Sequence, residues 1–173
     1  AERHLKTNPD SPQLQHLIGL IECQEGRLED GIAWLRRASE AEPTNIGFRV
    51  ILVRALADAG RADEALTVAG APGTSPPEHA LWFARAEAAD AARNAIASAE
   101  AWRVIANFSP RDWRAWASQG NALAALEDWP AAAEAFRRAV EINPAELAIR
   151  LSLAEALRRA GRNEEALAQF DLL

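Results

Sequence analysis

The residues best suited to catalysis or metal binding are three histidines and a single cysteine. His4, His16 and His79 lie far apart, and no cysteine or carboxylate stands near them at a metal-ligand spacing. His16 and Cys23 would share one face of a helix, but two turns separate them by about 10 Å, too far for a shared zinc ion. The sequence contains no glycine-rich phosphate loop and no nucleophile elbow. We therefore predict no catalytic residue, cofactor or metal ion in this chain, and a structural or solvent-facing role for Cys23.

The composition disfavours several classes of partner. The formal net charge is −6 and the isoelectric point is near 5.2, whereas nucleic-acid phosphates require a basic stripe. No apolar run approaches the roughly 18 residues that a membrane span needs. One cysteine leaves no intramolecular disulfide and is compatible with a reducing cytosol. Lys6 is the only lysine among 19 basic residues and alanine is abundant, so we expect a bacterial, cytoplasmic protein.

The elements that position these residues follow a strict period. Prolines recur in steps of 34, 34, 33 and 34 residues, at Pro9, Pro43, Pro77, Pro110 and Pro144. When the repeats are aligned, small residues recur at two positions in steps of 34, 33, 34 and 34, and we call these positions the small columns. The first column is Gly19, Val53, Ala86, Gly120 and Ala154, and the second is Gly31, Ala65, Ser98, Ala132 and Ala166. A fixed period near 34 indicates a stacked repeat array. The shared shorter step places one deletion just after Pro77.

Each repeat is predicted to be a helix–turn–helix pair, because apolar residues recur at spacings of three and four. The predicted pairs span 12–42, 45–70, 76–108 and 111–143, and a last pair begins near 145. Gly26, Gly60 and Gly161 fall between the two helices, where a positive φ ends the first one. Ser75 and Asn143 each precede a proline and stand three residues before a glutamate, which predicts a capped helix start at both. The small columns let the paired helices approach closely.

One repeat carries a recognisable pattern of residue types and spacings. It comprises Trp116, Gly120, Leu123, Ala132, Phe136, Ala139 and Pro144, and it resembles the tetratricopeptide repeat (TPR) signature. The resemblance extends over the chain, although Gln15, Arg49 and Arg150 depart from the tryptophan position. It implies an all-α fold, a right-handed α-solenoid of stacked antiparallel helix pairs. We expect one domain over 1–173, with repeats at about 12–45, 46–78, 79–112, 113–146 and 147–173, the last partial, after a remnant of an earlier repeat at 1–11.

Two features depart from a regular array. Gly70 and the segment 71–77 cannot continue a helix, so we expect a shortened helix, a local irregularity and the first proteolytic cleavage there. The chain also begins and ends within the pattern, which predicts a piece of a longer protein. Leu5, Phe170, Leu172 and Leu173 would lack a neighbouring repeat, and we expect end-to-end self-association.

The resemblance implies a concave groove lined by the first helix of each repeat. The residues at these positions are His16, Leu20, Gln24, Val50, Arg54, Asp58, Phe83, Glu87, Asp90, Arg114, Asn121, Leu151, Glu155 and Arg158. Leu20, Val50, Phe83 and Leu151 are apolar where a solvated face would be polar. Only Asn121 matches the carboxylate clamp of chaperone-binding members, so that role is disfavoured. Most tryptophans are expected in the core, and Trp113 is the candidate for an exposed contact.

Two functional interpretations are compatible with these residues. The first is a non-catalytic scaffold that binds a peptide or helix of a protein partner in the groove. The second is the TPR segment of a larger bacterial enzyme, of the sulfotransferase or glycosyltransferase type, that recruits substrate or organises the oligomer. Fold alone does not choose between them. The sequence that follows residue 173 in the parent gene would distinguish the two interpretations.

Overall fold

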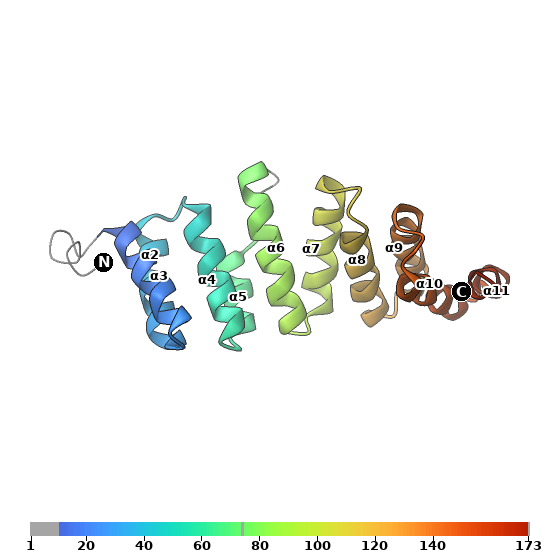
Figure 1. Cartoon of the computed structure of the whole chain (residues 1–173), viewed down its shortest axis with the longest axis horizontal. Helices are drawn as coiled ribbons and strands as arrows, with labels where there is room; N and C mark the ends of the chain where they lie inside the picture. The colour runs from blue at the N-terminus through green and yellow to red at the C-terminus, as the bar shows by residue number, and fades with distance from the viewer. Residues whose placement is uncertain (1–10, 74, 173) are drawn as a thin grey trace. The chain divides into compact units, whose positions relative to one another are not determined.

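The computed structural model describes residues 11–73 and 75–172, and within these ranges every regular element is a helix (Figure 1). The helices are α2 (Pro12–Gln24), α3 (Leu28–Ala41), α4 (Ile46–Asp58), α5 (Ala62–Ala69), α6 (Pro76–Ala91), α7 (Ala95–Phe108), α8 (Trp113–Ala125), α9 (Trp129–Ile142), α10 (Leu147–Arg159) and α11 (Asn163–Phe170). They lie where the period predicted pairs of helices. Apart from residue 11, the expected remnant at 1–11 lies outside the described residues, and so does Leu173.

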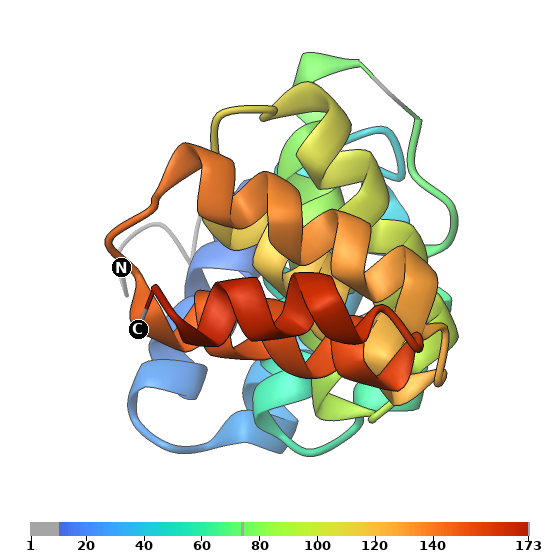
Figure 2. The same ribbon diagram turned by 90° about the vertical axis from the view of Figure 1, so that its right-hand side faces the viewer.

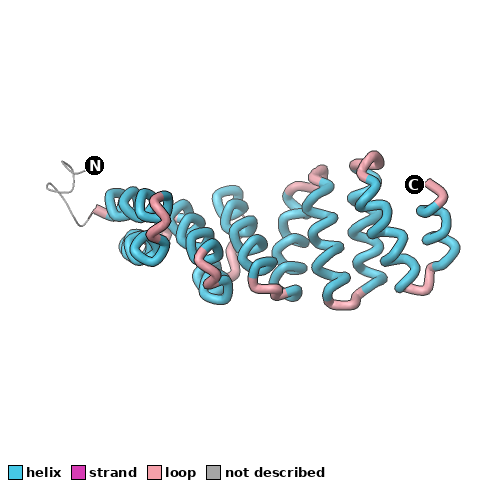
Figure 3. The backbone as a smooth tube through the Cα atoms, turned by 60° about the horizontal axis from the view of Figure 1, so that its bottom comes forward, coloured by secondary structure: helices cyan, strands magenta, loops and turns pink. Residues whose placement is uncertain are grey.

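The chain divides into two compact units, the first ending at Ala92 and the second beginning at Arg93. In unit 1, α2 packs on α3, α3 on α4 and α4 on α5, while α6 contacts both α4 and α5. In unit 2, each of α8, α9, α10 and α11 packs on the helix before it. Short loops join successive helices, as the tube in Figure 3 shows, and α10 and α11 stand in front in Figure 2. The single domain over 1–173 stays a prediction.

The turns inside the pairs follow the predicted backbone geometry. Gly26, Gly60 and Gly161 have φ values of 81°, 75° and 78°. Arg93 and Glu127 occupy the same place in the other two repeats and adopt φ values of 52° and 59°. A side chain in this left-handed region costs roughly 1–2 kcal/mol. The geometry of the turn therefore persists in the two repeats that lack the glycine.

Of the two predicted helix starts, the one at Ser75 is found and the one at Asn143 is wrong. Ser75 is the N-cap residue of α6, whose first turn contains the prolines, but its side chain caps no backbone N–H and its hydroxyl donates to the Glu78 carboxylate instead. Asn143 does not begin α10, which starts at Leu147 after Glu146. Instead, the Asn143 N–H donates to the carbonyl of Ala139 and closes α9. Among helices α2 to α11, the side-chain caps are those of Asn45, Asn94, Asp112 and Asp128, each of which accepts a backbone N–H two or three residues on.

The small columns are sites of close helix contact. A methyl group on Gly120 would lie 2.7 Å from two ring carbons of Phe136, which is buried in the unit 2 core. A methyl group on Gly19 would lie 2.9 Å from the carbonyl oxygen of Gly31 on α3. These distances are shorter than van der Waals contact, so the close approach requires the absence of a side chain.

The residue at the tryptophan position of the repeat, such as Trp116, donates a hydrogen bond in addition to filling space. The indole Nε1 of Trp116 donates to the carbonyl of Pro110 at 3.1 Å. Arg150, at the same position in the next repeat, donates from Nη2 to the carbonyl of Pro144 at 3.1 Å. Both side chains therefore hold the turn that precedes their own helix. This shared donor role explains why arginine can replace tryptophan there.

The predicted shortening of the second repeat is confirmed. α5 has 8 residues where α3 has 14, and Gly70 follows it with φ 60°. Side chains nevertheless hold the loop that follows. Arg85 donates to the Gly70 carbonyl at 2.6 Å, and Trp82 donates to the Gly73 carbonyl at 2.8 Å. Pro72 in this loop is buried.

Candidate functional site

The predicted binding residues lie on the first helices of the pairs, which are α2, α4 and α6 in unit 1 and α8 and α10 in unit 2. We call these surfaces the first-helix faces. In unit 1, five of the predicted residues are exposed to solvent: Gln24, Arg54, Asp58, Glu87 and Asp90. Leu20 and Phe83 are partly buried, and Leu20 packs against the core. The sequence pattern therefore selected a surface with both polar and apolar members.

Unit 1 has a cavity of about 450 Å³ on this face, at the N-terminal ends of α4 and α6. Its lining consists of His16, Asn45, Ile46, Gly47, Phe48, Val50, Ile51, Pro77 and Ala80. Only His16 and Val50 were predicted. Pro77 and Ala80 contribute because α6 begins at Pro76 and has 16 residues, against 13 in α4. A proline pair before an apolar run was the sequence signal for this longer helix.

His16 is the main titratable group of the unit 1 cavity. Its ring stacks on Phe48 of α4, with centroids 4.5 Å apart and an interplanar angle of 25°. Burial lowers the pKa of His16 below its ordinary value, so the ring is neutral at pH 7. Its Nδ1 atom is buried without a hydrogen-bond partner among the described residues. His16 thus behaves as a flat, mainly apolar wall of the cavity.

Val50 was predicted as an apolar residue of the binding groove, and it lines the unit 1 cavity although little of it is exposed. Only 7% of Val50 is exposed, and it belongs to the hydrophobic core of unit 1. Its apolar character is therefore explained by helix packing. Ile51, the next residue, is half-buried and supplies an apolar surface to the same cavity.

Charges on the unit 1 face are paired across neighbouring helices. Arg54 Nε on α4 lies 3.2 Å from Glu87 Oε2 on α6, and both side chains are about half exposed. Such exposed pairs contribute little to stability, so both groups keep the capacity to exchange partners. Burial raises the pKa of the Cys23 thiol, and nearby Asp58 and Glu22 raise it further, which disfavours the reactive thiolate form.

Unit 2 has a cavity of about 320 Å³ on its first-helix face. It is lined by Asn121, Ala124, Trp129, Phe136, Leu151, Ser152, Glu155 and Ala156. Asn121, Leu151 and Glu155 were predicted as binding residues, and Leu151 is 50% exposed. Trp129 was missed as a site residue because the sequence placed it on a second helix. The guanidinium of Arg159 covers its ring, 5.2 Å from the centroid.

The charges of the unit 2 face centre on Glu155. Hydrogen bonds from Arg158 and then Arg159 lower the pKa of Glu155 to about 2, so it remains ionised at any physiological pH. Two arginines against one carboxylate leave this corner net positive. Arg114 lies elsewhere on the face, with its guanidinium 4.5 Å from the Trp113 ring centroid. Trp113 itself is half-buried and packs on the unit 2 core.

Over residues 11–73 and 75–172, no three histidine, cysteine or acidic side chains are grouped closely enough to hold a metal ion. His4 lies outside these ranges. Among the described helices, none combines the length and apolar character needed to cross a membrane. Phe170 and Leu172 are exposed, at 39% and 62%, and the expected end-to-end self-association stays a prediction.

Comparison with solved structures shows the same fold. A structure titled "Crystal structure of MamA protein" is 16% identical with a TM-score of 0.75, covering 93% of this chain and 88% of that one. MamA from Desulfovibrio magneticus RS-1, residues 41 to the end, is 19% identical with a TM-score of 0.71, covering 92% and 91%. These likenesses show the α-solenoid fold alone. A search of curated proteins by sequence found no significant match.

The sequence itself matches one protein-family model, described as a tetratricopeptide repeat. The two matches run over residues 83–146 and 118–173, and together they span more than half of the chain. They include the repeat whose residues carry the resemblance, with Trp116, Gly120 and Phe136. Such arrays are scaffolds for protein–protein interaction. The chain belongs to the tetratricopeptide repeat family.

Proposed function

We propose that this chain is a non-catalytic scaffold that binds a peptide or a helix of a partner protein on its first-helix faces. The observation that carries this proposal is the cavity on each of these faces. Each cavity combines an apolar lining with polar side chains, which is the composition of a binding site rather than of a solvated helix surface. The proposal needs no catalytic group.

The unit 1 cavity supplies the apolar anchor. An aliphatic or aromatic side chain of the partner would lie between the His16 ring and Ile51, against Pro77 and Ala80 of α6. Burial of one such side chain contributes about 1.5–3 kcal/mol, and a few anchors of this kind dominate the affinity of an interface. Arg54 and Glu87, two turns further along their helices, would set the orientation of a charged partner segment.

The unit 2 cavity supplies directional contacts. The Asn121 amide can donate to and accept from a peptide backbone, and the Ser152 hydroxyl adds one further polar group. Leu151 and Trp129 provide apolar contact beside them. The net positive corner formed by Arg158 and Arg159 favours an acidic residue in the partner. A ligand of alternating apolar and acidic residues therefore fits this face.

The experiment blocks a cavity without removing core atoms. Ala80 is exposed and lines the unit 1 cavity, so Ala80→Trp fills the anchor site while α6 stays intact. Ala168→Trp, at an exposed position of the second helix α11, is the matched control. A partner captured with the parent protein should bind the Ala80→Trp variant at least about tenfold more weakly. It should bind the control unchanged.

If Ala168→Trp abolishes binding and Ala80→Trp does not, the partner docks on the second helices and the proposal is wrong. Circular dichroism of both variants verifies that the helices are retained. The alternative, a TPR segment within a larger enzyme, remains a prediction that the parent gene sequence tests.

A further inference from the structure

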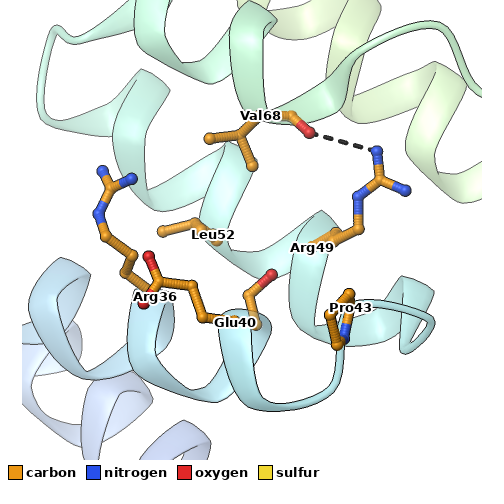
Figure 4. Close-up of a pocket in the computed structure, with 7 residues that line it drawn as sticks. Arg36, Glu40, Pro43, Arg49, Leu52 and Val68 are labelled. Atoms are coloured by element: carbon orange, nitrogen blue, oxygen red, sulfur yellow. Dashed lines mark hydrogen bonds between the residues drawn. The ribbon is translucent and has the colours of Figure 1, made fainter.

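A third cavity lies away from the two described above. Its volume is about 550 Å³, and we call it the notch. It is lined by Arg36, Ser39, Glu40, Pro43, Arg49, Leu52 and Val68, which belong to α3, α4, α5 and the loop after α3. None of these residues was predicted to bind a partner. In Figure 4, Arg36 and Arg49 stand on opposite sides of Leu52.

The notch lies beside the point at which α5 stops early. Val68 is in the last turn of α5, which ends at Ala69. In unit 2, the corresponding helix α9 has 14 residues and stays helical to Ile142. α5 therefore lacks six residues, which would occupy about 9 Å of helix axis. The notch therefore lies next to the early end of α5, on a side of the pair where this chain supplies less of its own second helix.

The lining combines an apolar floor with unused hydrogen-bond donors. Leu52, Val68 and Pro43 provide the apolar surface. Arg36 donates one N–H to Glu64, and Arg49 donates from Nη2 to the carbonyls of Val68 and Ala69. A guanidinium carries five N–H donors, so both arginines keep donors for another acceptor. Carboxylates are the acceptors that match arginine best.

We propose that the notch docks a short helical segment of a partner protein, in which one leucine-sized residue is flanked by glutamate or aspartate one turn away on each side. The apolar residue packs on Leu52, Val68 and Pro43. The two carboxylates face Arg36 and Arg49, which stand on opposite sides of this floor. Glu40 is the single acidic residue of the lining and opposes such a ligand, so it limits the affinity.

The repeat symmetry offers matched controls. Arg137 and Glu141 on α9 occupy the positions of Arg36 and Glu40, because both pairs are separated by three repeats. At α9 the helix is complete. A substitution that acts through general surface charge changes ligand affinity equally on α3 and on α9. One that acts through the notch changes the affinity only on α3.

The test uses two synthetic alanine-rich peptides of about 16 residues, long enough to be partly helical alone. One has a central leucine with glutamates one turn on either side, and the other has lysines in their place. Fluorescence anisotropy should show binding of the glutamate peptide at least about tenfold tighter than that of the lysine peptide. Arg36→Glu should weaken its binding by about tenfold or more, and Glu40→Arg should strengthen it several-fold.

Arg137→Glu and Glu141→Arg should leave both affinities unchanged. Glu40 is exposed, so its variant keeps the proposal testable if Arg36→Glu disturbs the pair with Glu64. Ala80→Trp should not alter peptide binding here, which separates this site from the proposed first-helix site. The proposal is overturned if the glutamate peptide does not bind, or if the α9 variants change its affinity as much as the α3 variants do.

Discussion

Replacing Gly19 by alanine tests whether the approach of α2 to α3 limits the size of the first small column. The added methyl group would lie 2.7 Å from Cγ of Leu35 and 2.9 Å from the carbonyl oxygen of Gly31. Leu35 is fully buried, and the Gly31 oxygen belongs to the backbone of α3. Neither group can move aside without shifting a helix.

Two opposing effects decide the sign of the change in stability. Alanine favours the helix over glycine by about 0.8–1 kcal/mol. Overpacking a well-filled interface costs about 1–3 kcal/mol, and a backbone contact belongs at the upper end of that range. The expected result is a net loss of about 1–2 kcal/mol in the free energy of unfolding. For a chain of this length, that lowers Tm by roughly 2–8 °C.

The assay is thermal and urea unfolding followed by circular dichroism, with Gly47→Ala as the control. Gly47 also lies in a first helix, but a methyl group there meets only the Asn45 side-chain oxygen, at 3.3 Å. The control should therefore be neutral or stabilising by up to about 1 kcal/mol. Equal stabilisation by Gly19→Ala and Gly47→Ala would refute the close-contact explanation of the column.

Three further outcomes are expected. Glu127→Gly and Arg93→Gly should each raise the free energy of unfolding by up to about 1 kcal/mol in urea titrations, because glycine relieves a positive φ; a loss of stability in both would contradict the strain. Burial lowers the pKa of His16, so the folded state binds fewer protons than the unfolded state. The contribution of His16 to the free energy of unfolding is therefore complete above pH 6.5 and is lost as the pH falls towards the lowered pKa. In His16→Phe, measured by unfolding at pH 7.5 and 5.5, that part of the pH dependence should disappear. Trp116→Phe should lose about 1 kcal/mol with the hydrogen bond to Pro110; an unchanged Tm would show that the bond is not stabilising.

Much of the fold could be predicted from the sequence because its causes are local. Helix positions follow from apolar spacing, and the turns follow from residues that tolerate a positive φ, such as Gly60. The early end of α5 follows from Gly70 and the prolines after it. The first-helix faces follow from the repeat register, which is why Asn121, Leu151 and Glu155 line one cavity together.

Other features depend on contacts between residues that are distant in sequence. Asn143 closes α9 instead of beginning α10, because competition between two helix ends is decided by the path of the loop between them. Val50 is buried by the packing of neighbouring helices. Helix periodicity assigns a residue to a face, but burial also depends on how closely the next helix approaches.

The sequence by itself determined the all-α repeat architecture, its period and the side of each pair that carries the predicted binding residues. The tertiary structure alone decided where that surface is hollowed. The unit 1 cavity needs the longer α6 beside α4, and the notch needs α5 to end next to Arg49 of α4. A cavity is the space that side chains from several helices leave unfilled, and its volume depends on their relative positions, which no local pattern encodes.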